Sequence, residues 1–191
     1  MRVNKPTGFT LIELVIGIVV FSNALVLFSS LIVPQAIRSV DPIFQVRATE
    51  LGQSLINEIA SKSFDEKSDR TGGSTLCSQT IAPLCTTSDD FGAEEGFSNR
   101  QNFNDVDDYN GLSESDGGIK NTLNENVTVG DANLYQGFSA SVIVFYDDDM
   151  DGINDAIDGG GNYIGKTKLV NVTITTPNNE EILFSTFRSN Y

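Results

Sequence analysis

The fold is decided by residues 9–33, which read FTLIELVIGIVVFSNALVLFSSLIV. Of these 25 residues, 18 are hydrophobic, and Glu13 is the only charged one. As a helix with a rise of about 1.5 Å per residue, the stretch spans about 37 Å, whereas the hydrocarbon core of a bilayer is about 30 Å thick. We therefore expect residues 9–33 to form a transmembrane helix.

The flanks of this stretch predict its fate and its orientation. A secretory signal has an apolar core of about 7 to 15 residues followed by a small-residue cleavage site, and residues 9–33 fit neither feature. Arg2 and Lys5 precede the stretch, and the next basic residue is Arg38. Because basic flanks stay in the cytoplasm, we expect a single-pass protein with a cytoplasmic amino terminus and an external carboxyl-terminal part.

Glu13 requires an explanation of its own. A carboxylate at the centre of an apolar membrane helix costs about 2.5 to 3.5 kcal/mol on insertion scales, and such residues usually mark a function or a partner. Near the start of the helix, the side chain could instead reach the membrane interface. The neighbouring residues favour the first interpretation, because residues 8–15 read GFTLIELV after a short basic leader. This run closely resembles the class III signal of type IV pilins and pseudopilins.

The resemblance implies how the chain is processed and assembled. A prepilin peptidase would cut after Gly8, which makes residues 1–8 a cleaved leader, and Phe9 would become the N-methylated amino terminus. In pilins, the carboxylate that corresponds to Glu13 meets the terminal amine of a neighbouring subunit. An opposite charge of this kind would offset the cost of the buried carboxylate and fix the axial register.

Residues 34–64 are predicted to form an amphipathic helix, kinked between Pro34 and Pro42. Pro34 ends the apolar run and is expected to cause a kink or a short break, and Asp41 and Pro42 are expected to start the next helix as N-cap and first helical residue. Apolar residues then recur at helical spacing, at Phe44, Ala48, Leu51, Leu55 and Ile59. Such a stripe is typical of a helix that packs on a sheet.

Residues 65–191 are predicted to form a β-rich head outside the cytoplasm. Residues 138–146 are rich in β-branched and aromatic residues, and residues 169–176 and 181–187 are expected to form a hairpin. Residues 85–137 are interpreted mostly as loop, with a short strand candidate at 126–129. The predicted class is α+β and type IV pilin-like, with a long amino-terminal helix packed on a carboxyl-terminal antiparallel sheet.

The charge is concentrated in one part of the head. The chain has 12 Lys and Arg against 26 Asp and Glu, a formal charge of −14, and residues 89–158 hold 17 acidic and two basic residues. A chain without a basic face is not expected to bind nucleic acid. It also has no histidine, which excludes imidazole catalysis and histidine-ligated zinc. We expect an acidic loop region that is either a solvated surface or a cation site.

The strongest chemical motif lies at residues 147–158, which read DDDMDGINDAID. Counted from Asp147, aspartate occupies positions 1, 3, 5, 9 and 12 and glycine position 6, the ligand order of a twelve-residue calcium loop. Hard carboxylate oxygens suit Ca²⁺, and Gly152 permits the sharp turn. The predicted calcium ligands are Asp147, Asp149, Asp151, the backbone carbonyl of Ile153, Asp155 and Asp158.

This motif departs from an EF-hand. Asn154 stands where an aliphatic residue is usual, and a predicted strand and glycines flank the loop in place of two helices. The motif more closely resembles the DxDxDGxxDxxD loops of thrombospondin type 3 repeats. The alternative is an acidic turn without a cation. A second acidic run, residues 105–111, is interpreted as a structural loop whose aspartates cap local amides, with calcium binding as its alternative.

The chain has two cysteines, Cys77 and Cys85. They predict a disulfide that closes a small loop in an oxidising compartment such as a bacterial periplasm, with two free thiols as the alternative. A CxxC redox motif and a zinc site are excluded by the spacing and the number of cysteines.

Together these features predict a minor pilin. Residues 8–73 and, more loosely, the last 25 residues are most similar to minor pilins of the mannose-sensitive haemagglutinin (MSHA) pilus. The resemblance implies a non-enzymatic subunit in the bacterial inner membrane, with a periplasmic head, that is incorporated into the pilus. Its expected partners are other pilin subunits, prepilin peptidase and the inner-membrane assembly machinery. The alternatives are a minor pseudopilin of a type II secretion system and a membrane-tethered, calcium-dependent adhesive module.

Overall fold

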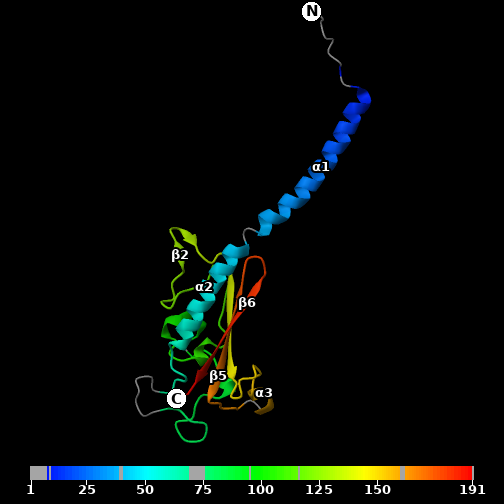
Figure 1. Cartoon of the computed structure of the whole chain (residues 1–191). Coiled ribbons are helices and arrows are strands. Elements are labelled where there is room, and N and C mark those ends of the chain that lie inside the picture. The colour runs from blue at the N-terminus through cyan, green and yellow to red at the C-terminus, as the bar shows by residue number, and fades with distance from the viewer. Residues whose placement is uncertain are drawn as a thin grey trace, which may run out of the picture. The chain divides into compact units, whose positions relative to one another are not determined.

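The computed structural model describes residues 8, 10–38, 41–68, 76–94, 96–115, 117–159 and 162–190. They form an α+β protein with an apolar helix near the amino terminus and an antiparallel sheet toward the carboxyl terminus (Figure 1). The chain divides into two compact units, residues 1–43 and 44–191. The predicted α+β class and the predicted order of helix and sheet are confirmed.

The first unit is dominated by helix α1, Leu11–Arg38. Among the described residues, it is the helix long and apolar enough to cross a membrane, and its side chains from Leu11 to Ser30 are exposed. The helix continues through Pro34 and ends at Arg38, so there is no break in it at Pro34, and the predicted kink stays a prediction. Proline removes one helical hydrogen bond, and the flanking turns of this helix keep theirs.

Helix α2, Asp41–Ala60, carries the predicted amphipathic stripe. Ala48, Leu51, Leu55 and Ile59 are buried in one core cluster, and Phe44 packs against it. The helix begins at Asp41, the predicted N-cap, and ends at Ala60, four residues before the predicted end. Residues 61 and 62 close it with backbone hydrogen bonds, after which the chain enters a bridge between Ser63 and Asp105.

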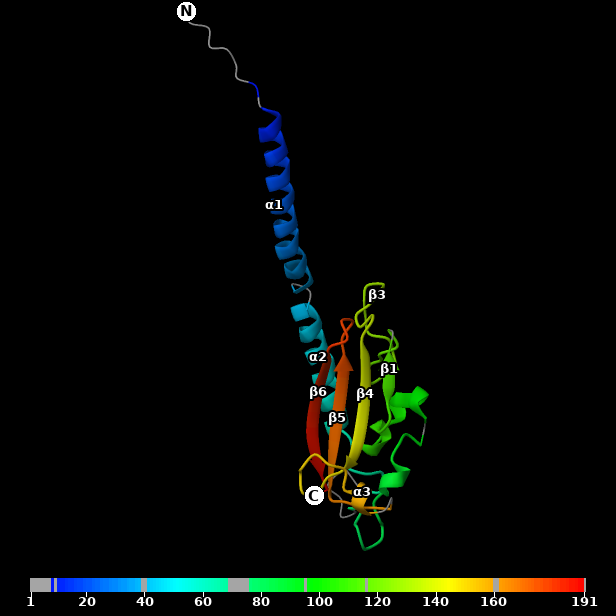
Figure 2. The same cartoon turned by 90° about the vertical axis from the view of Figure 1, so that its right-hand side faces the viewer.

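The main sheet has four antiparallel strands in the order β1-β4-β5-β6 (Figure 2). These strands are β1, Ser113–Ser115; β4, Ser139–Tyr146; β5, Thr167–Thr175; and β6, Glu181–Ser189. Three of them match the predicted strands to within about two residues, and the predicted hairpin is the β5–β6 pair. Asn179 makes the turn of this hairpin with a φ of 60°.

One face of the sheet packs on α2. Along β5, Val170, Val172 and Ile174 are buried, and they join the α2 residues in the main core cluster. Gly52 of α2 marks the closest approach, because a Cβ atom there would lie 2.3 Å from the ring of Phe184 on β6. The absence of a side chain at position 52 therefore sets how near the helix lies to the sheet.

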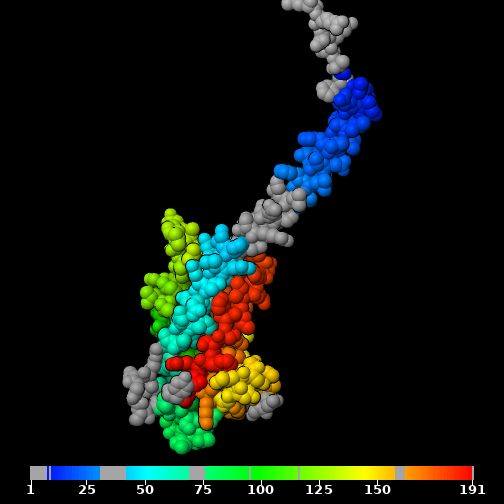
Figure 3. Space-filling model, in the orientation of Figure 1, coloured from blue at the N-terminus to red at the C-terminus, as the bar shows by residue number. Residues whose placement is uncertain are grey.

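The connections are mostly irregular, as predicted. They hold three short 3₁₀ helices, Ser88–Asp90, Phe97–Asn102 and Asp107–Tyr109, a small hairpin of β2, Thr128–Val129, and β3, Ala132–Asn133, and the short helix α3, Ala156–Gly159. The segment between β4 and α3, yellow in the space-filling view, forms part of the molecular surface (Figure 3). Strand β2 lies within the candidate strand 126–129.

Candidate functional site

The predicted calcium loop leaves the end of β4 and turns back on itself. Oxygen atoms of Asp147, Asp149 and Asp151 lie within 4.8 Å of one another. Asp147 is buried and accepts hydrogen bonds from the backbone N–H groups of Asp151 (3.1 Å) and Gly152 (2.9 Å). Gly152 has a φ of 85°, the left-handed conformation that the predicted turn requires. Positions 1, 3 and 5 of the motif therefore converge.

The remaining predicted ligands are not gathered around this group. Asp155 accepts a hydrogen bond from the backbone N–H of Asp148 at 2.7 Å, and it is not part of the converging group. Ile153 donates its N–H to Asp151 at 2.7 Å. Asp158 lies in α3, and its side chain is not among those that the structure describes. The hydrogen bond from Asp148 to the carboxylate of Asp155 closes the loop, so this carboxylate has a structural role in the loop.

Asp148, which the spacing does not make a ligand, anchors the loop. Its Oδ1 accepts the backbone N–H groups of Lys166 and Thr167 at 2.7 and 2.8 Å, and its Oδ2 accepts the hydroxyl of Tyr163 at 3.1 Å. Burial, together with this hydrogen bond and the charge of Asp148, raises the pKa of Tyr163 to about 12. Asp148 thus fixes the loop to the start of β5.

The donor chemistry of the loop fits a hard cation. Three convergent carboxylates repel one another, and a divalent ion would offset that repulsion. Asp149 and Asp151 are exposed, so an ion could reach them from solvent. Asp147, Asp149 and Asp151 are the residues that would hold it.

The second acidic run forms a buried cluster, made of Asp65, Asp105, Asp107, Asp108 and Lys168. Lys168 lies at its centre, with its side chain 0% exposed. Its Nζ is 2.6 Å from Oδ1 of Asp107 and 3.7 Å from Oδ2 of Asp65. Aspartates of the acidic run 105–111 are therefore buried next to an internal cation, Lys168.

Aromatic rings complete the surroundings of Lys168. Its Nζ lies 4.4 Å from the ring centroid of Phe64, 4.7 Å from that of Phe91 and 5.5 Å from that of Tyr146. It also donates a hydrogen bond to the backbone carbonyl of Phe64 at 2.7 Å. Ring faces attract a cation, and the attraction is stronger where water is excluded.

The aspartates of the buried cluster differ in their roles. Oδ2 of Asp108 accepts the backbone N–H groups of Asn104 (2.7 Å) and Asp105 (3.2 Å), which is the predicted capping of local amides. Burial raises the pKa of the Asp105 carboxyl to about 9, and the charge of Asp107 and a hydrogen bond with it add to the shift. Asp105 is therefore protonated at neutral pH, next to the ion pair of Asp107 and Lys168.

A second internal cation, Arg100, ties α2 to the irregular connection. Its guanidinium is 2% exposed and binds both carboxylate oxygens of Glu58, at 3.0 and 2.6 Å. It also binds Glu114 at 3.2 Å, and Tyr109 donates its hydroxyl to Glu58 at 2.8 Å. Sequence reasoning missed this network. The available signal was that Arg100 is one of two basic residues in the strongly acidic stretch 89–158.

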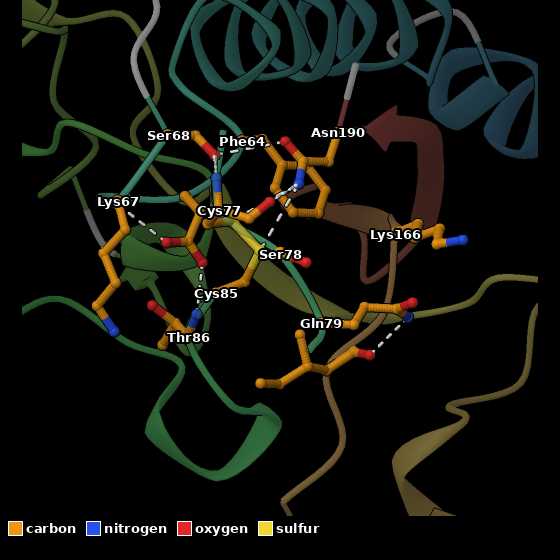
Figure 4. The surroundings of a disulfide bond; sticks show 12 residues. Phe64, Lys67, Ser68, Cys77, Ser78, Gln79, Cys85, Thr86, Lys166 and Asn190 are labelled. Carbon is orange, nitrogen blue, oxygen red and sulfur yellow. Dashed lines mark hydrogen bonds between the residues drawn. A yellow bond between two sulfur atoms is a disulfide. The ribbon is translucent and has the colours of Figure 1, made fainter. Parts of the chain in front are cut away.

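The predicted disulfide joins Cys77 and Cys85 (Figure 4). Cys77 donates its backbone N–H to Ser68 at 3.1 Å, and Asn190 donates its side-chain amide to the carbonyl of Cys77 at 2.9 Å. These hydrogen bonds of Cys77 hold the disulfide loop next to Asn190, which follows β6, and the alternative of two free thiols is wrong.

The residues expected to direct processing and assembly lie before and within the first turn of α1. Gly8 is exposed, and Phe9 lies outside the described residues. The backbone N–H of Glu13 donates to the hydroxyl of Thr10 at 3.4 Å, so Thr10 acts as the N-cap of α1, a role that the sequence reasoning did not assign. A comparison with known protein families, characterised proteins and solved structures found no match to this chain.

Proposed function

We propose that this chain is a minor pilin of an MSHA-type type IV pilus, made as an inner-membrane precursor. In this proposal, prepilin peptidase cuts after Gly8, Phe9 becomes N-methylated, and the inner-membrane assembly machinery adds the subunit to the filament. The observation that carries the proposal is the run GFTLIELV at the start of an exposed apolar helix.

The energetics of α1 support assembly with other copies or other pilin subunits. The described side chains of this helix are exposed, including Leu14, Val19 and Phe21 at 58%, 55% and 65%. A lipid bilayer or neighbouring helices would cover such a surface. Glu13 lies in the same helix, and an amine from the next subunit would offset the cost of its carboxylate in an apolar setting.

The head is proposed to bind Ca²⁺ through Asp147, Asp149 and Asp151. The convergence of their oxygens within 4.8 Å supports this part of the proposal. Calcium would order the exposed end of the loop without any role in chemistry, and we propose no enzymatic activity.

Mass spectrometry of the amino terminus in purified pili tests the assignment. The expected result is a chain that begins with methylated Phe9. Full-length, unmethylated chain in membranes and in sheared filaments would overturn the proposal. A minor pseudopilin would be processed in the same way but recovered with the secretion apparatus, so the fraction that contains the mature chain separates the two.

Replacement of Glu13 tests the role of the carboxylate. Glu13→Ala should abolish incorporation into filaments while the precursor remains in the membrane. Glu50→Ala is the matched control, because Glu50 is also an exposed glutamate on a helix, and this variant should be incorporated normally. A calcium-dependent adhesive module that is only tethered would keep its binding in the Glu13→Ala variant, which would favour that alternative.

A further inference from the structure

Lys168 and Asp107 lie in a geometry suited to reaction. Nζ of Lys168 is 2.6 Å from Oδ1 of Asp107, and the two side chains are 0% and 3% exposed. Because a C–O bond is about 1.2 Å long, Cγ of Asp107 lies less than about 4 Å from Nζ. Reacting atoms in near-attack conformers are about 3 to 3.5 Å apart. The fold therefore holds the nitrogen of Lys168 close to a carboxyl carbon in a place without access to water.

We propose that Lys168 and Asp107 become joined by an amide bond between Nζ and Cγ, with Asp105 as the acid that assists the reaction. The proposal concerns the head alone and does not depend on the assignment as a pilin. It assigns a covalent modification to side chains that otherwise form an unusual internal ion pair.

The surroundings favour a neutral product over the ion pair. Separate charges in an apolar interior are costly, and an amide bond removes both of them. In the proposed reaction, a proton first passes from Nζ to Asp107 across their 2.6 Å contact, which frees the lone pair of Nζ. The rings of Phe64, Phe91 and Tyr146 enclose Nζ and exclude water. Only the neutral amine has the lone pair that attacks a carbon atom.

Asp105 is placed to assist at the carboxyl group. It is 1% exposed, and its raised pKa keeps it protonated at neutral pH. Its hydrogen bond with Asp107 lets it polarise the C=O bond as the amine adds and then protonate the departing hydroxyl. Its own charge does not change over the whole reaction, because it recovers the proton that the nitrogen releases.

The reaction balances without any other reactant. The lone pair of Nζ forms the new bond to Cγ, and the bond from Cγ to the hydroxyl oxygen of Asp107 breaks. The hydroxyl leaves as water with one proton, and Nζ keeps one hydrogen in the amide. Neither partner is oxidised or reduced, so the products are one amide and one water molecule.

Asp65 is the other carboxylate near Lys168, and its contacts make it a poorer partner. Its Oδ2 is 3.7 Å from Nζ. Its two oxygens accept the backbone N–H groups of Lys67 (3.0 Å) and Thr86 (2.6 Å). Both oxygens of Asp65 are therefore held by backbone groups, which restricts movement of its carboxylate toward Nζ. The structure therefore favours Asp107 as the acyl donor.

Peptide mass spectrometry of the full chain, purified from membranes in detergent, tests the proposal. Digestion with trypsin should give a branched peptide in which residues 101–120 are joined to residues 167–188, uncut after Lys168 and lighter by one water. Lys168→Met should give the two peptides separately. Lys166→Met changes an exposed lysine two residues away and removes its trypsin site, so the branch should remain, with residues 101–120 joined to residues 121–188.

Two further variants separate the bond from the fold. Asp105→Asn keeps both reacting side chains and should yield unjoined peptides, whereas Asp107→Asn should yield a branched peptide formed with loss of ammonia in place of water. The Cys77–Cys85 disulfide and a cooperative thermal transition report folding in each variant. Folded wild-type chain with separate peptides would overturn the proposal, as would a bond from Lys168 to Asp65. A bond that survives in Asp105→Asn would overturn the role of Asp105.

Discussion

Two groups of aspartates in the head look alike in the sequence and differ in their surroundings. In the calcium loop, Asp149 and Asp151 are exposed to solvent. In the buried cluster, Asp105 and Asp107 are 1% and 2% exposed and surround Lys168. The exposed carboxylates can bind an external cation. In the buried cluster, Asp107 instead pairs with an internal cation, and Asp105 holds a proton.

The largest expected effect tests the internal cation. Lys168→Met would leave Asp107 without the partner that neutralises it, whether by charge or by the proposed amide, and removal of one partner of a buried pair costs about 3 to 5 kcal/mol. Lys166→Met, at an exposed position, should change the free energy of unfolding by less than about 0.5 kcal/mol. Denaturant melts of the full chain in detergent measure both. Equal changes in the free energy of unfolding for the two variants would show that Lys168 is not needed as a partner for the buried aspartates.

The next effect tests the external cation. Calcium at about 100 times its dissociation constant should raise the melting temperature by about 5 to 10 °C, because only the folded loop binds it. Asp149→Asn with Asp151→Asn should abolish this shift.

Two controls sharpen the calcium test. Asp89→Asn with Asp131→Asn removes two exposed carboxylates elsewhere and should keep the shift. Asp105→Asn should also keep it, because the buried cluster is closed to solvent. Loss of the shift in Asp105→Asn would instead support calcium binding at residues 105–111, the alternative interpretation of that run.

The last test concerns the pH dependence of stability. The pKa of Asp105 rises from 3.8 to about 9 on folding, so the folded chain holds a proton that the unfolded chain releases. The corresponding stability is fully present below about pH 4 and is lost as the pH rises through about 9. The melting temperature of the wild type should therefore fall more steeply between about pH 5 and pH 9 than that of Asp105→Asn. Asp131→Asn, an exposed control, should keep the wild-type slope.

The spacing of residues along the sequence predicted those parts of the fold in which the contacting residues are near one another in the sequence. The helical spacing from Phe44 to Ile59 gave the buried face of α2, and the alternation of Val170 with Asn171 gave the two faces of β5. The spacing of aspartates along residues 147–151 likewise predicted three carboxylates that converge. In each case the residues that contact one another are near in sequence or share one period.

The buried cluster could not be predicted in this way. Lys168 and Asp107 are 61 residues apart, and a lysine at the start of a strand is normally exposed. Asp105 and Asp149 have similar acidic neighbours, so composition does not distinguish the buried run from the exposed part of the calcium loop. The difference arises from tertiary packing, since the rings of Phe64 and Phe91 come from separate parts of the chain. The same holds for Arg100 and its partner Glu58 on α2.

The close approach of Gly52 to Phe184 has a consequence for genetics. Any side chain at position 52 must displace the Phe184 ring, so the two positions are constrained as a pair. A selection that begins from Gly52→Ala should therefore return second-site suppressors in which Phe184 is replaced by a smaller apolar residue. Suppressors of this kind would report, in living cells, that α2 and β6 pack against each other.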